Sequence, residues 1–515
     1  MNPPYYYFSL QYSAIQKTIL RHDRLWSISG ISQKLAQLNE VDLPQIVENK
    51  QGLTIVAGGG KFIARFEDDE HGQKARREII KTISTQLPML EFQASEIIPA
   101  DNFEEAKNDK KIIDGLNEQR RNFRGYGVTF NPHIMVCEEC GEYPAVKKVR
   151  FPDKKERFLC TVCKMARECS RIDLESLKKK GVHNAPTIIK IYKRYLDGLQ
   201  SNEMLEIALD FDDLFPAKQD EDENTNKANR MAVWFSDINS MNDKVPIWLT
   251  QPEDKVRKIF DKVKEVNINA ISDALIDTFP HTGHGYLPFR LIVAGGDDLC
   301  IVMDSQYILD FCLNLSSKIE AEIDRLTEVH PLHHVWLKKH SNEIVKEPKQ
   351  YSFGSSFVVT SVHTPFKKIH EVGEELMSRA KHETERQGNS VNWCVAADEE
   401  TVSDEILRFE KPLFIEFPPP ENAEDHLKER LVFSKYVELV KEFSNISLSH
   451  IHQIITILID NKGDSSKART ELIKHAQKDS DKDFSQVLER FDNNGCIDSA
   501  RIATLFELIT IGRKK

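Results

Sequence analysis

Two stretches of this chain repeat one pattern, an apolar strand followed by a glycine-rich turn and a second apolar strand. The first stretch covers residues 56–68 and the second covers residues 293–304. Such a pattern is typical of a β-hairpin. Upstream of each hairpin lies a second match, because residues 8–13 parallel residues 235–240 in the same order. A duplicated unit built around a hairpin constrains the fold more than any other feature of the sequence.

The elements around the two hairpins also correspond in order. The first copy predicts a strand at 5–10, a helix at 13–35, the hairpin, a helix at 73–85 and a strand at 90–97. The second predicts a strand at 232–237, a helix at 254–279, the hairpin, a helix at 306–326 and a strand at 351–360. Both copies read βαββαβ, which predicts an α+β protein with two ferredoxin-like domains. The alternative is two unrelated domains that share a Gly-Gly hairpin by accident.

Three carboxylates distinguish the second copy from the first. They are Asp237 on the first strand, and Asp297 and Asp298 at the hairpin turn. The first copy is expected to have Leu10, Gly60 and Lys61 at these places. In a ferredoxin-like sheet the first strand lies beside the hairpin, so the three carboxylates would converge. Clustered carboxylates repel one another unless a cation neutralises them, and their hard oxygens suit Mg²⁺ or Mn²⁺.

This acidic cluster predicts metal-dependent phosphoryl chemistry. Two ions held there would activate a ribose hydroxyl and stabilise a leaving pyrophosphate. Gly295 and Gly296 would let a triphosphate approach the backbone closely. The alternative is a solvated Asp-Asp turn, which is common in hairpins. The position of Asp237 on the preceding strand favours the catalytic interpretation.

Four cysteines lie in two closely spaced pairs between the copies. They are Cys137, Cys140, Cys160 and Cys163, with nineteen residues between the pairs. Four thiolates at this spacing are typical of a closed tetrahedral Zn²⁺ site, which stabilises a fold and does not catalyse a reaction. The alternative is four buried free thiols. Only nine cysteines in the chain and no export signal indicate a reducing compartment, where paired cysteines suggest a metal.

The composition excludes several classes of protein. The chain has 515 residues, 40% of them hydrophobic, and a net charge of −11. An acidic chain is not a uniformly basic nucleic-acid binder, although a local basic groove is compatible with it. The apolar runs are too short to span a bilayer, and the N-terminus lacks the pattern of a secretory signal. We therefore expect a cytoplasmic protein with no membrane partner.

Taken together, these features resemble the large subunit of type III CRISPR effector complexes. The resemblance rests on the duplicated unit, the Gly-Gly-Asp-Asp hairpin at 295–298 and the cysteine pairs between the copies. Residues 15–19 and 24–29 look like the first helix of the first palm domain in Cmr-type members. Residues 353–356 and 380–381 resemble the family's small-residue strand and following helix. The likeness covers roughly residues 5–400, and a helical remainder fits the family's C-terminal domain.

The resemblance implies synthesis of cyclic oligoadenylates from ATP by a degenerate and a catalytic palm domain. Asp237 and Asp298 would be the main metal ligands, with Asp297 assisting. The remaining nucleotide and metal contacts implied by the family are Ile238, Asn239, Gly295, Gly296, Ser355 and Lys381. Guide or target RNA and other CRISPR effector subunits are implied partners, and a dimer if the chain works alone. The family's N-terminal histidine–aspartate nuclease domain is not expected, because the first copy begins at about residue 5. The dipeptide His22-Asp23 falls within the helix of this copy and is interpreted as incidental.

Four domains are expected along the chain. They are a degenerate palm at 1–110, a zinc-binding and helical linker at 111–228, a catalytic palm at 229–415 and an all-α domain at 416–515. An acidic stretch at 215–230 predicts a loop before the catalytic palm, and consecutive prolines at 418–420 predict a break before the last domain.

Two other functions stay open at the level of sequence. One is an RNA-binding scaffold subunit, which would not need to retain three mutually repelling carboxylates. The other is a template-directed nucleotide polymerase, which the sequence does not separate from a cyclase. A diguanylate-cyclase-like enzyme is disfavoured by the duplicated unit and the cysteine pairs.

Overall fold

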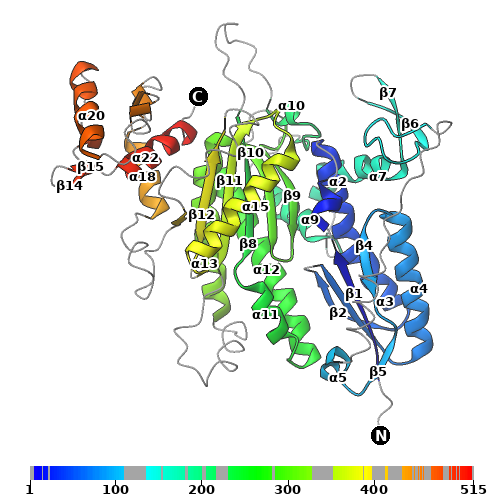
Figure 1. Cartoon of the computed structure of the whole chain (residues 1–515). Coiled ribbons are helices and arrows are strands. Elements are labelled where there is room, and N and C mark those ends of the chain that lie inside the picture. Colours follow the sequence, from blue (N-terminus) through cyan, green and yellow to red (C-terminus); the bar gives the residue numbers. More distant parts are fainter. Residues whose placement is uncertain are drawn as a thin grey trace, which may run out of the picture.

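The computed structural model (Figure 1) describes most of the chain. The described residues are 5–13, 15–20, 24–58, 60–108, 135–151, 155–179, 182, 184–199, 205–215, 230–280, 285–327, 352–386, 388–396, 412–415, 432–443, 446, 450–451, 453–454, 456–457, 465–479, 486–488, 490–493, 496–497 and 499–512. The dipeptide His22-Asp23, the core of the predicted loop at 216–229 and the prolines at 418–420 lie outside them.

A first βαββαβ unit forms around an antiparallel sheet at the N-terminus. Its strands are β1 (Tyr5–Ser13), β2 (Leu53–Gly58), β3 (Lys61–Phe66) and β4 (Glu91–Ala94), in the order β2-β3-β1-β4. The short β5 (Ile98–Ala100) also pairs with β1. The connecting helices are α1 (Ile15–Ile19), α2 (Leu25–Gln37), the π-helix η1 (Leu38–Asp42), α3 (Leu43–Asn49) and α4 (Asp69–Gln86), followed by α5 (Phe103–Asn108). The strand order is that of a ferredoxin-like unit, as the hairpin pattern predicts.

Helix α4 shows how local sequence sets the limits of an element in this unit. Asp68 precedes it in extended conformation, and its side chain accepts a hydrogen bond from the His71 backbone N–H. Such a cap satisfies one of the free donors at a helix start. Ala75, Ile79 and Ile83 follow at helical spacing and are fully buried against the sheet.

A second, larger unit contains a six-stranded sheet. The strands are β8 (Arg230–Ile238), β9 (Phe289–Gly295), β10 (Asp298–Asp304), β11 (Phe353–Ser361), β12 (Ser390–Val395) and β13 (Leu413–Phe414), in the order β13-β12-β11-β8-β10-β9. The helices are α11 (Met241–Trp248), α12 (Glu253–Thr278), the 3₁₀ turn η2 (Ser305–Tyr307), α13 (Ile308–Thr327) and α15 (Phe366–Glu383). The four strands β8 to β11 repeat the topology of the first unit. The strand β12, parallel to β11, is an extension that the repeat did not predict.

The central strand β8 divides the core of the second unit into two layers. Ala232 and Trp234 face the cluster that contains α12 and α13, whereas Val233 and Phe235 face the cluster that contains α15 and α2. Alternate side chains of a strand point to opposite faces. Because helices cover both faces, every residue from 231 to 236 is buried. Figure 1 shows α15 in front of the sheet and α12 behind it.

Strand pairing corrects one detail of the match between the copies. Asp298 pairs with Asp237 in the second unit, whereas Lys61 pairs with Gln11 in the first. Gln11, and not Leu10, is therefore the counterpart of Asp237. Leu10 is fully buried in the core of the first sheet. Since a shift of one residue exchanges the two faces of a strand, a neutral amide stands in the first unit where the second has a carboxylate.

The region between the units is a short hairpin followed by helices. It consists of β6 (Lys147–Arg150), β7 (Glu156–Leu159), α7 (Thr161–Ser170), α8 (Leu174–Lys179), α9 (Thr187–Gly198) and α10 (Phe211–Leu214). Gly30 on α2 packs directly on α7, because a Cβ at Gly30 would lie 1.8 Å from the Ala166 carbonyl oxygen. The β6–β7 hairpin projects from the molecule beside the first unit (Figure 1).

The C-terminal region is mainly, but not purely, helical. Its helices include α18 (Phe433–Glu442), α20 (Ser465–Asp479) and α22 (Ser499–Gly512). Two short strands, β14 (Asp492–Asn493) and β15 (Cys496–Ile497), pair with each other, so the expectation of an all-α domain was wrong in this detail. Trp393 Nε1 of β12 donates to Glu507 of α22 over 3.0 Å, which joins this region to the second sheet.

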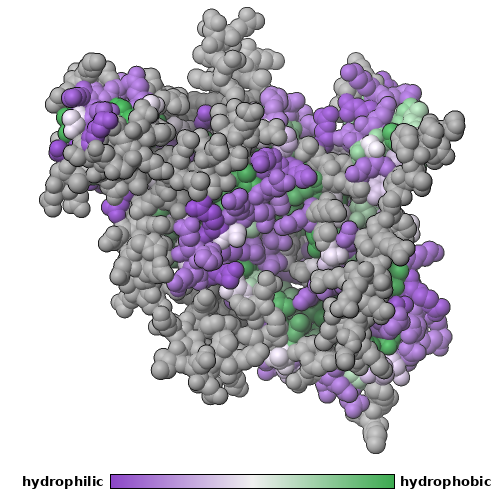
Figure 2. Space-filling model, in the orientation of Figure 1, coloured by the Kyte–Doolittle hydropathy of each residue, from purple (hydrophilic) through white to green (hydrophobic). Residues whose placement is uncertain are grey.

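Within the described part of the chain, the two units meet at two apolar contacts. At the first, α2 packs on the second sheet, and Arg290 Nη2 donates to Ser29 Oγ over 2.7 Å. The second involves the first sheet. Tyr7 and Val56 of the first sheet lie in one buried cluster with Leu249 and Val256 of the second unit. Beside them, Arg65 pairs with Glu253 at 3.1 Å. Hydrophilic residues dominate the described surface on the face shown in Figure 2, with hydrophobic residues in small areas between them. Among the described helices, none has a long enough apolar stretch to cross a membrane.

Candidate active site

The fold brings the three predicted carboxylates together. Asp237 lies near the end of β8, directly opposite Asp298 at the start of β10. Asp297 lies in the preceding turn, and its backbone carbonyl accepts a hydrogen bond from the Ile238 N–H over 3.2 Å. One carboxylate oxygen of each aspartate lies within 4.8 Å of those of the other two. This spacing allows all three to ligate one cation or a pair of neighbouring cations.

Backbone contacts hold the turn that carries Asp297 and Asp298. Gly296 has a φ of +65°, a left-handed conformation that glycine adopts without strain. Its carbonyl accepts a hydrogen bond of 2.7 Å from Asn267 Nδ2 of α12. Gly295 pairs with Asp298 across the hairpin. The turn is therefore fixed from the strand side and from the helix side.

Lys381 reaches the acidic cluster from α15. Its ammonium forms an ion pair with Asp237 Oδ2, and both side chains are mostly buried, at 11% and 26% exposed. The lysine stem passes over Gly354, which lies directly opposite Asp237 on β11. A Cβ on Gly354 would lie 2.2 Å from Lys381 Cγ, so only glycine leaves room for the lysine. The position of the Lys381 side chain therefore depends on glycine at position 354.

The donor set fits a divalent cation. Asp237 Oδ1 is buried and accepts no hydrogen bond from the described residues, although a buried carboxylate oxygen normally has a partner. Desolvation, followed by the charge of Asp237, raises the pKa of Asp297 to about 6. Desolvation in the crowded turn, then the charges of Asp297 and Asp237, also raise the pKa of Asp298. Bound Mg²⁺ or Mn²⁺ would offset this repulsion and complete the bonding of Asp237.

A fourth carboxylate near the cluster was missed by the sequence analysis. Glu374 lies on α15, and desolvation followed by the charge of Asp237 raises the pKa of its carboxyl group. Its own charge contributes to the raised pKa of Asp298. Glu374 and Lys381 are seven residues apart, which is two helical turns. Helical periodicity alone could thus have placed both on the face of α15 that meets the cluster.

A cavity of about 380 Å³ opens beside the carboxylates. This volume includes open solvent, and the space that the centre of a water molecule can occupy is only about 30 Å³. Apolar residues form much of the wall. The lining residues are Thr187, Ser236, Asp237, Ile238, Asn267, Ile271, Ala294, Gly295, Asp297, Asp298, Leu299, Leu315, Ile319 and Phe353. The apolar wall next to a cation site offers a surface on which a planar base attached to phosphates could pack.

Four of the six predicted nucleotide contacts lie outside the cavity lining, namely Asn239, Gly296, Ser355 and Lys381. Ser355 is fully buried, and its hydroxyl donates to the Ser390 carbonyl over 2.7 Å. Asn239 is also buried, and its Nδ2 donates to Ser352 Oγ and to the Gly388 carbonyl at 2.9 and 3.2 Å. In this arrangement Asn239 joins the end of β8 to the chain before β11, which positions Asp237 beside its neighbours.

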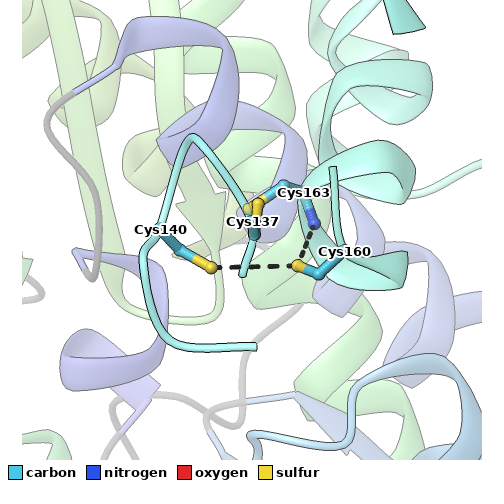
Figure 3. Close-up of side chains that lie close together, drawn as sticks. All are labelled: Cys137, Cys140, Cys160 and Cys163. Atoms are coloured by element: carbon cyan, nitrogen blue, oxygen red, sulfur yellow. Dashed lines mark hydrogen bonds between the residues drawn. The ribbon is translucent and has the colours of Figure 1, made fainter. Parts of the chain in front are cut away.

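The four predicted cysteines form a compact cluster (Figure 3). One sulfur from each of Cys137, Cys140, Cys160 and Cys163 lies within 4.8 Å of the other three, and the Cys140 and Cys160 sulfurs are 3.9 Å apart. Cys160 caps α7 by accepting a hydrogen bond from the Cys163 N–H. The Gly141 N–H donates to the Cys137 carbonyl, and the φ of Gly141 is +65°.

The geometry and chemistry of this cluster fit Zn²⁺. Hydrogen bonds from Cys140, and then from Cys160 and Cys163, lower the pKa of Cys137, whereas hydrogen bonds with Cys137 and Cys140 raise the pKa of Cys160 and Cys163. A bound Zn²⁺ would hold all four as thiolates. The described cysteines carry no disulfide. Cys169, on the same helix α7, lies outside the group of four.

Comparison with solved structures shows a shared fold over nearly the whole chain. The apo Csm1-Csm4 cassette matches with a TM-score of 0.54 and 12% identity, over 99% of this chain and 70% of that one. The cassette in complex with one ATP gives 0.54 and 11%, and the cassette in complex with cA4 gives 0.53 and 11%, with the same coverage. No protein-family model and no curated protein matches the sequence.

These matches confirm, at the level of fold, what the resemblance implies. Identities near 11% carry no information on individual residues, and a shared fold does not establish a shared activity. The mixed α+β architecture is therefore shown to be Csm1-like, whereas the chemistry depends on the residues of the site.

Proposed function

We propose that this chain is an ATP-dependent nucleotidyltransferase that makes cyclic oligoadenylates in a type III CRISPR-related defence system. The observation that carries the proposal is the convergence of Asp237, Asp297 and Asp298 beside an apolar cavity. The Csm1-like fold supports it, since the similar cassettes were solved with one ATP and with cA4. In this proposal the first unit is a degenerate palm and the second a catalytic palm.

Each residue of the site has a proposed role. Asp237 and Asp298 hold Mg²⁺ or Mn²⁺ as main ligands, Asp297 assists, and the Ile238 carbonyl completes the ligand set. The bound ions would supply activation of a ribose hydroxyl and stabilisation of the leaving pyrophosphate. Lys381, now paired with Asp237, would offer its ammonium to a nucleotide phosphate.

The cavity supplies the proposed base pocket. Ile271, Leu315 and Phe353 form apolar walls against which a purine could pack. Gly295 and Gly296 leave the hairpin backbone open to a triphosphate. Ser355 lies two residues beyond Phe353 on the same face of β11, so we assign it a supporting role behind the pocket wall. Asn239 is likewise assigned to positioning Asp237.

We also propose a division into four domains and a set of partners for the chain. The domain division is 1–110, 111–228, 229–415 and 416–515, with a structural Zn²⁺ held by the four cysteines in the second part. Guide or target RNA and other effector subunits are the proposed partners, with a dimer as the arrangement for a chain that works alone. The proposed location is the cytoplasm.

An RNA-binding scaffold is the second candidate, and one observation favours it. Lys381 already neutralises Asp237, as expected of a site that no longer binds a cation. The two other carboxylates and the cavity have no role in a scaffold. Catalysis therefore explains more of the site.

The test is incubation of the purified chain with each nucleoside triphosphate and Mg²⁺ or Mn²⁺, followed by mass spectrometry. The proposal predicts pyrophosphate and cyclic products from ATP. Linear products whose sequence follows an added template would indicate a polymerase instead. No nucleotide consumption, with RNA added or omitted, would leave the scaffold function.

A further inference from the structure

One face of helix α12 contacts the turns of both glycine hairpins. A Cβ on Gly58, at the end of β2, would lie 3.7 Å from Lys264 Cε. One helical turn further on, Asn267 Nδ2 donates to the Gly296 carbonyl of the other hairpin over 2.7 Å. Residues three apart share a helix face and are about 4.5 Å apart along the axis. The two hairpin turns therefore lie close together along one helix, although they are far apart in sequence.

The charge of Lys264 at this junction is not balanced by the protein. Lys264 is partly buried, and its ammonium has no hydrogen bond or ion pair with any residue that the structure describes. Lys262 on the same helix differs, because it pairs with Glu265 at 2.5 Å. Lys61, which follows the first hairpin turn, also has no ion pair within the described part of the chain. Two cations thus flank one glycine turn.

A partly desolvated ammonium is stabilised by an anion in contact with it. Gly58 carries no side chain that could block an anion from approaching Lys264, whereas Ile15 Cδ1 covers Gly60, at 3.3 Å from where a Cβ would stand. The catalytic turn contacts the same helix one turn away, and its carboxylates would themselves repel an anion unless cations are bound. Phosphate groups bound together with divalent cations would place an anion beside the lysines and cations beside the carboxylates.

We propose that Lys264 binds the phosphates of a nucleotide held between the two hairpins, in the reaction proposed above, on which this inference rests. The contact is to phosphate and not to base or ribose, because an ammonium pairs with an anionic group. Lys264 therefore contributes to the affinity for triphosphates and not to the affinity for nucleosides.

The experiment compares Lys264→Ala with Lys262→Ala, a matched control on the same helix. Binding of an ATP analogue with a methylene group between the α- and β-phosphates, which cannot undergo nucleotidyl transfer, is measured by calorimetry with Mg²⁺. Adenosine is the second probe. Loss of one charge-assisted contact should weaken binding of the analogue about tenfold in Lys264→Ala. Lys262→Ala should bind like the wild type, and Lys264→Arg should retain most of the affinity because it keeps the charge.

Each outcome bears on the proposal. Equal affinity of Lys264→Ala and Lys262→Ala for the analogue would overturn it. Weaker binding of adenosine in parallel with the analogue would also overturn it, since that result indicates a packing role. A wild-type chain that consumes ATP while Lys264→Ala binds normally would leave the proposed function intact. A wild-type chain that neither binds nor consumes nucleotides would contradict both proposals.

Discussion

The two βαββαβ units share one strand order, and the groups around their hairpins differ at the three positions that could bind a metal. The second unit has Asp237, Asp297 and Asp298 around its hairpin. The first unit has Gln11, Gly60 and Lys61 at the equivalent places, as the strand pairing shows. The apolar alternation that builds both sheets is independent of these positions. The topology can therefore be duplicated while only one copy retains the groups that a metal requires.

The surroundings of the two hairpins differ in the same sense. In the second unit, Asn267 bonds the turn and Lys381 pairs with Asp237 beside a cavity. The first hairpin has Lys61 and no carboxylate at the corresponding positions, and Lys264 of α12 lies beside it. An acidic turn and a basic turn on one helix suit a substrate that carries both cations and phosphates.

The largest expected loss of activity comes from replacing the aspartates of the second unit with neutral residues, as in the first unit. Asp298→Asn removes one negative charge from the proposed metal site with almost no change in side-chain volume. It should lower the rate of nucleotidyl transfer by about a hundredfold or more. Asp237→Asn should behave alike, and the double variant should be little worse than either, because both serve one site. Product formation at saturating Mn²⁺ measures this. Asp261→Asn, an exposed aspartate on α12, is the control and should stay active.

The next effect concerns the cysteine cluster beside the first unit. Cys160→Ser removes a proposed zinc ligand and the cap of α7, and should lower the melting temperature by more than about 4 °C. Metal analysis of the wild type should find about one zinc per chain. Cys169→Ser, on the same helix but outside the cluster, should retain the zinc. Unchanged stability of zinc-free protein would contradict a structural site.

Lys381→Ala sharpens the comparison by removing the cation from the acidic turn. Its ammonium competes with a metal for Asp237 and is proposed to bind phosphate. We therefore expect tighter Mn²⁺ binding, by a few-fold, together with an increase of about tenfold in the KM for ATP. Lys367→Ala, exposed on the same helix, should change neither value. Weaker Mn²⁺ binding together with weaker ATP binding in Lys381→Ala would show that Lys381 acts only by maintaining the fold.

The smallest effect is expected in the first unit. Lys61→Ala should raise the apparent KM for ATP a few-fold, because a second nucleotide loses a phosphate contact, while the metal dependence stays unchanged. Steady-state kinetics at varied ATP and Mn²⁺ test this, with Lys81→Ala on α4 as the exposed control. Unchanged kinetics would leave the first unit as a scaffold.

The sequence predicted the strands of both units and the convergence of the three aspartates, because apolar runs and turn glycines are local signals. It misplaced the counterpart of Asp237 by one residue. Leu10 matches Asp237 when the two copies are compared by sequence, but Leu10 faces the core and Gln11 is the structural counterpart. It did not predict β12 or the pairing of β14 with β15, because very short or fully buried strands lack alternation. The contact of Asn267 with Gly296 depends on tertiary packing that no local pattern encodes.

The central claim is that the carboxylates of the second unit bind a divalent cation and that the first unit binds none. The most direct measurement is a Mn²⁺ titration by electron paramagnetic resonance, with the non-reactive ATP analogue present. We expect saturable Mn²⁺ binding in the wild type and in Lys61→Ala, and its loss in Asp298→Asn. Equal Mn²⁺ binding by the wild type and Asp298→Asn would contradict the account.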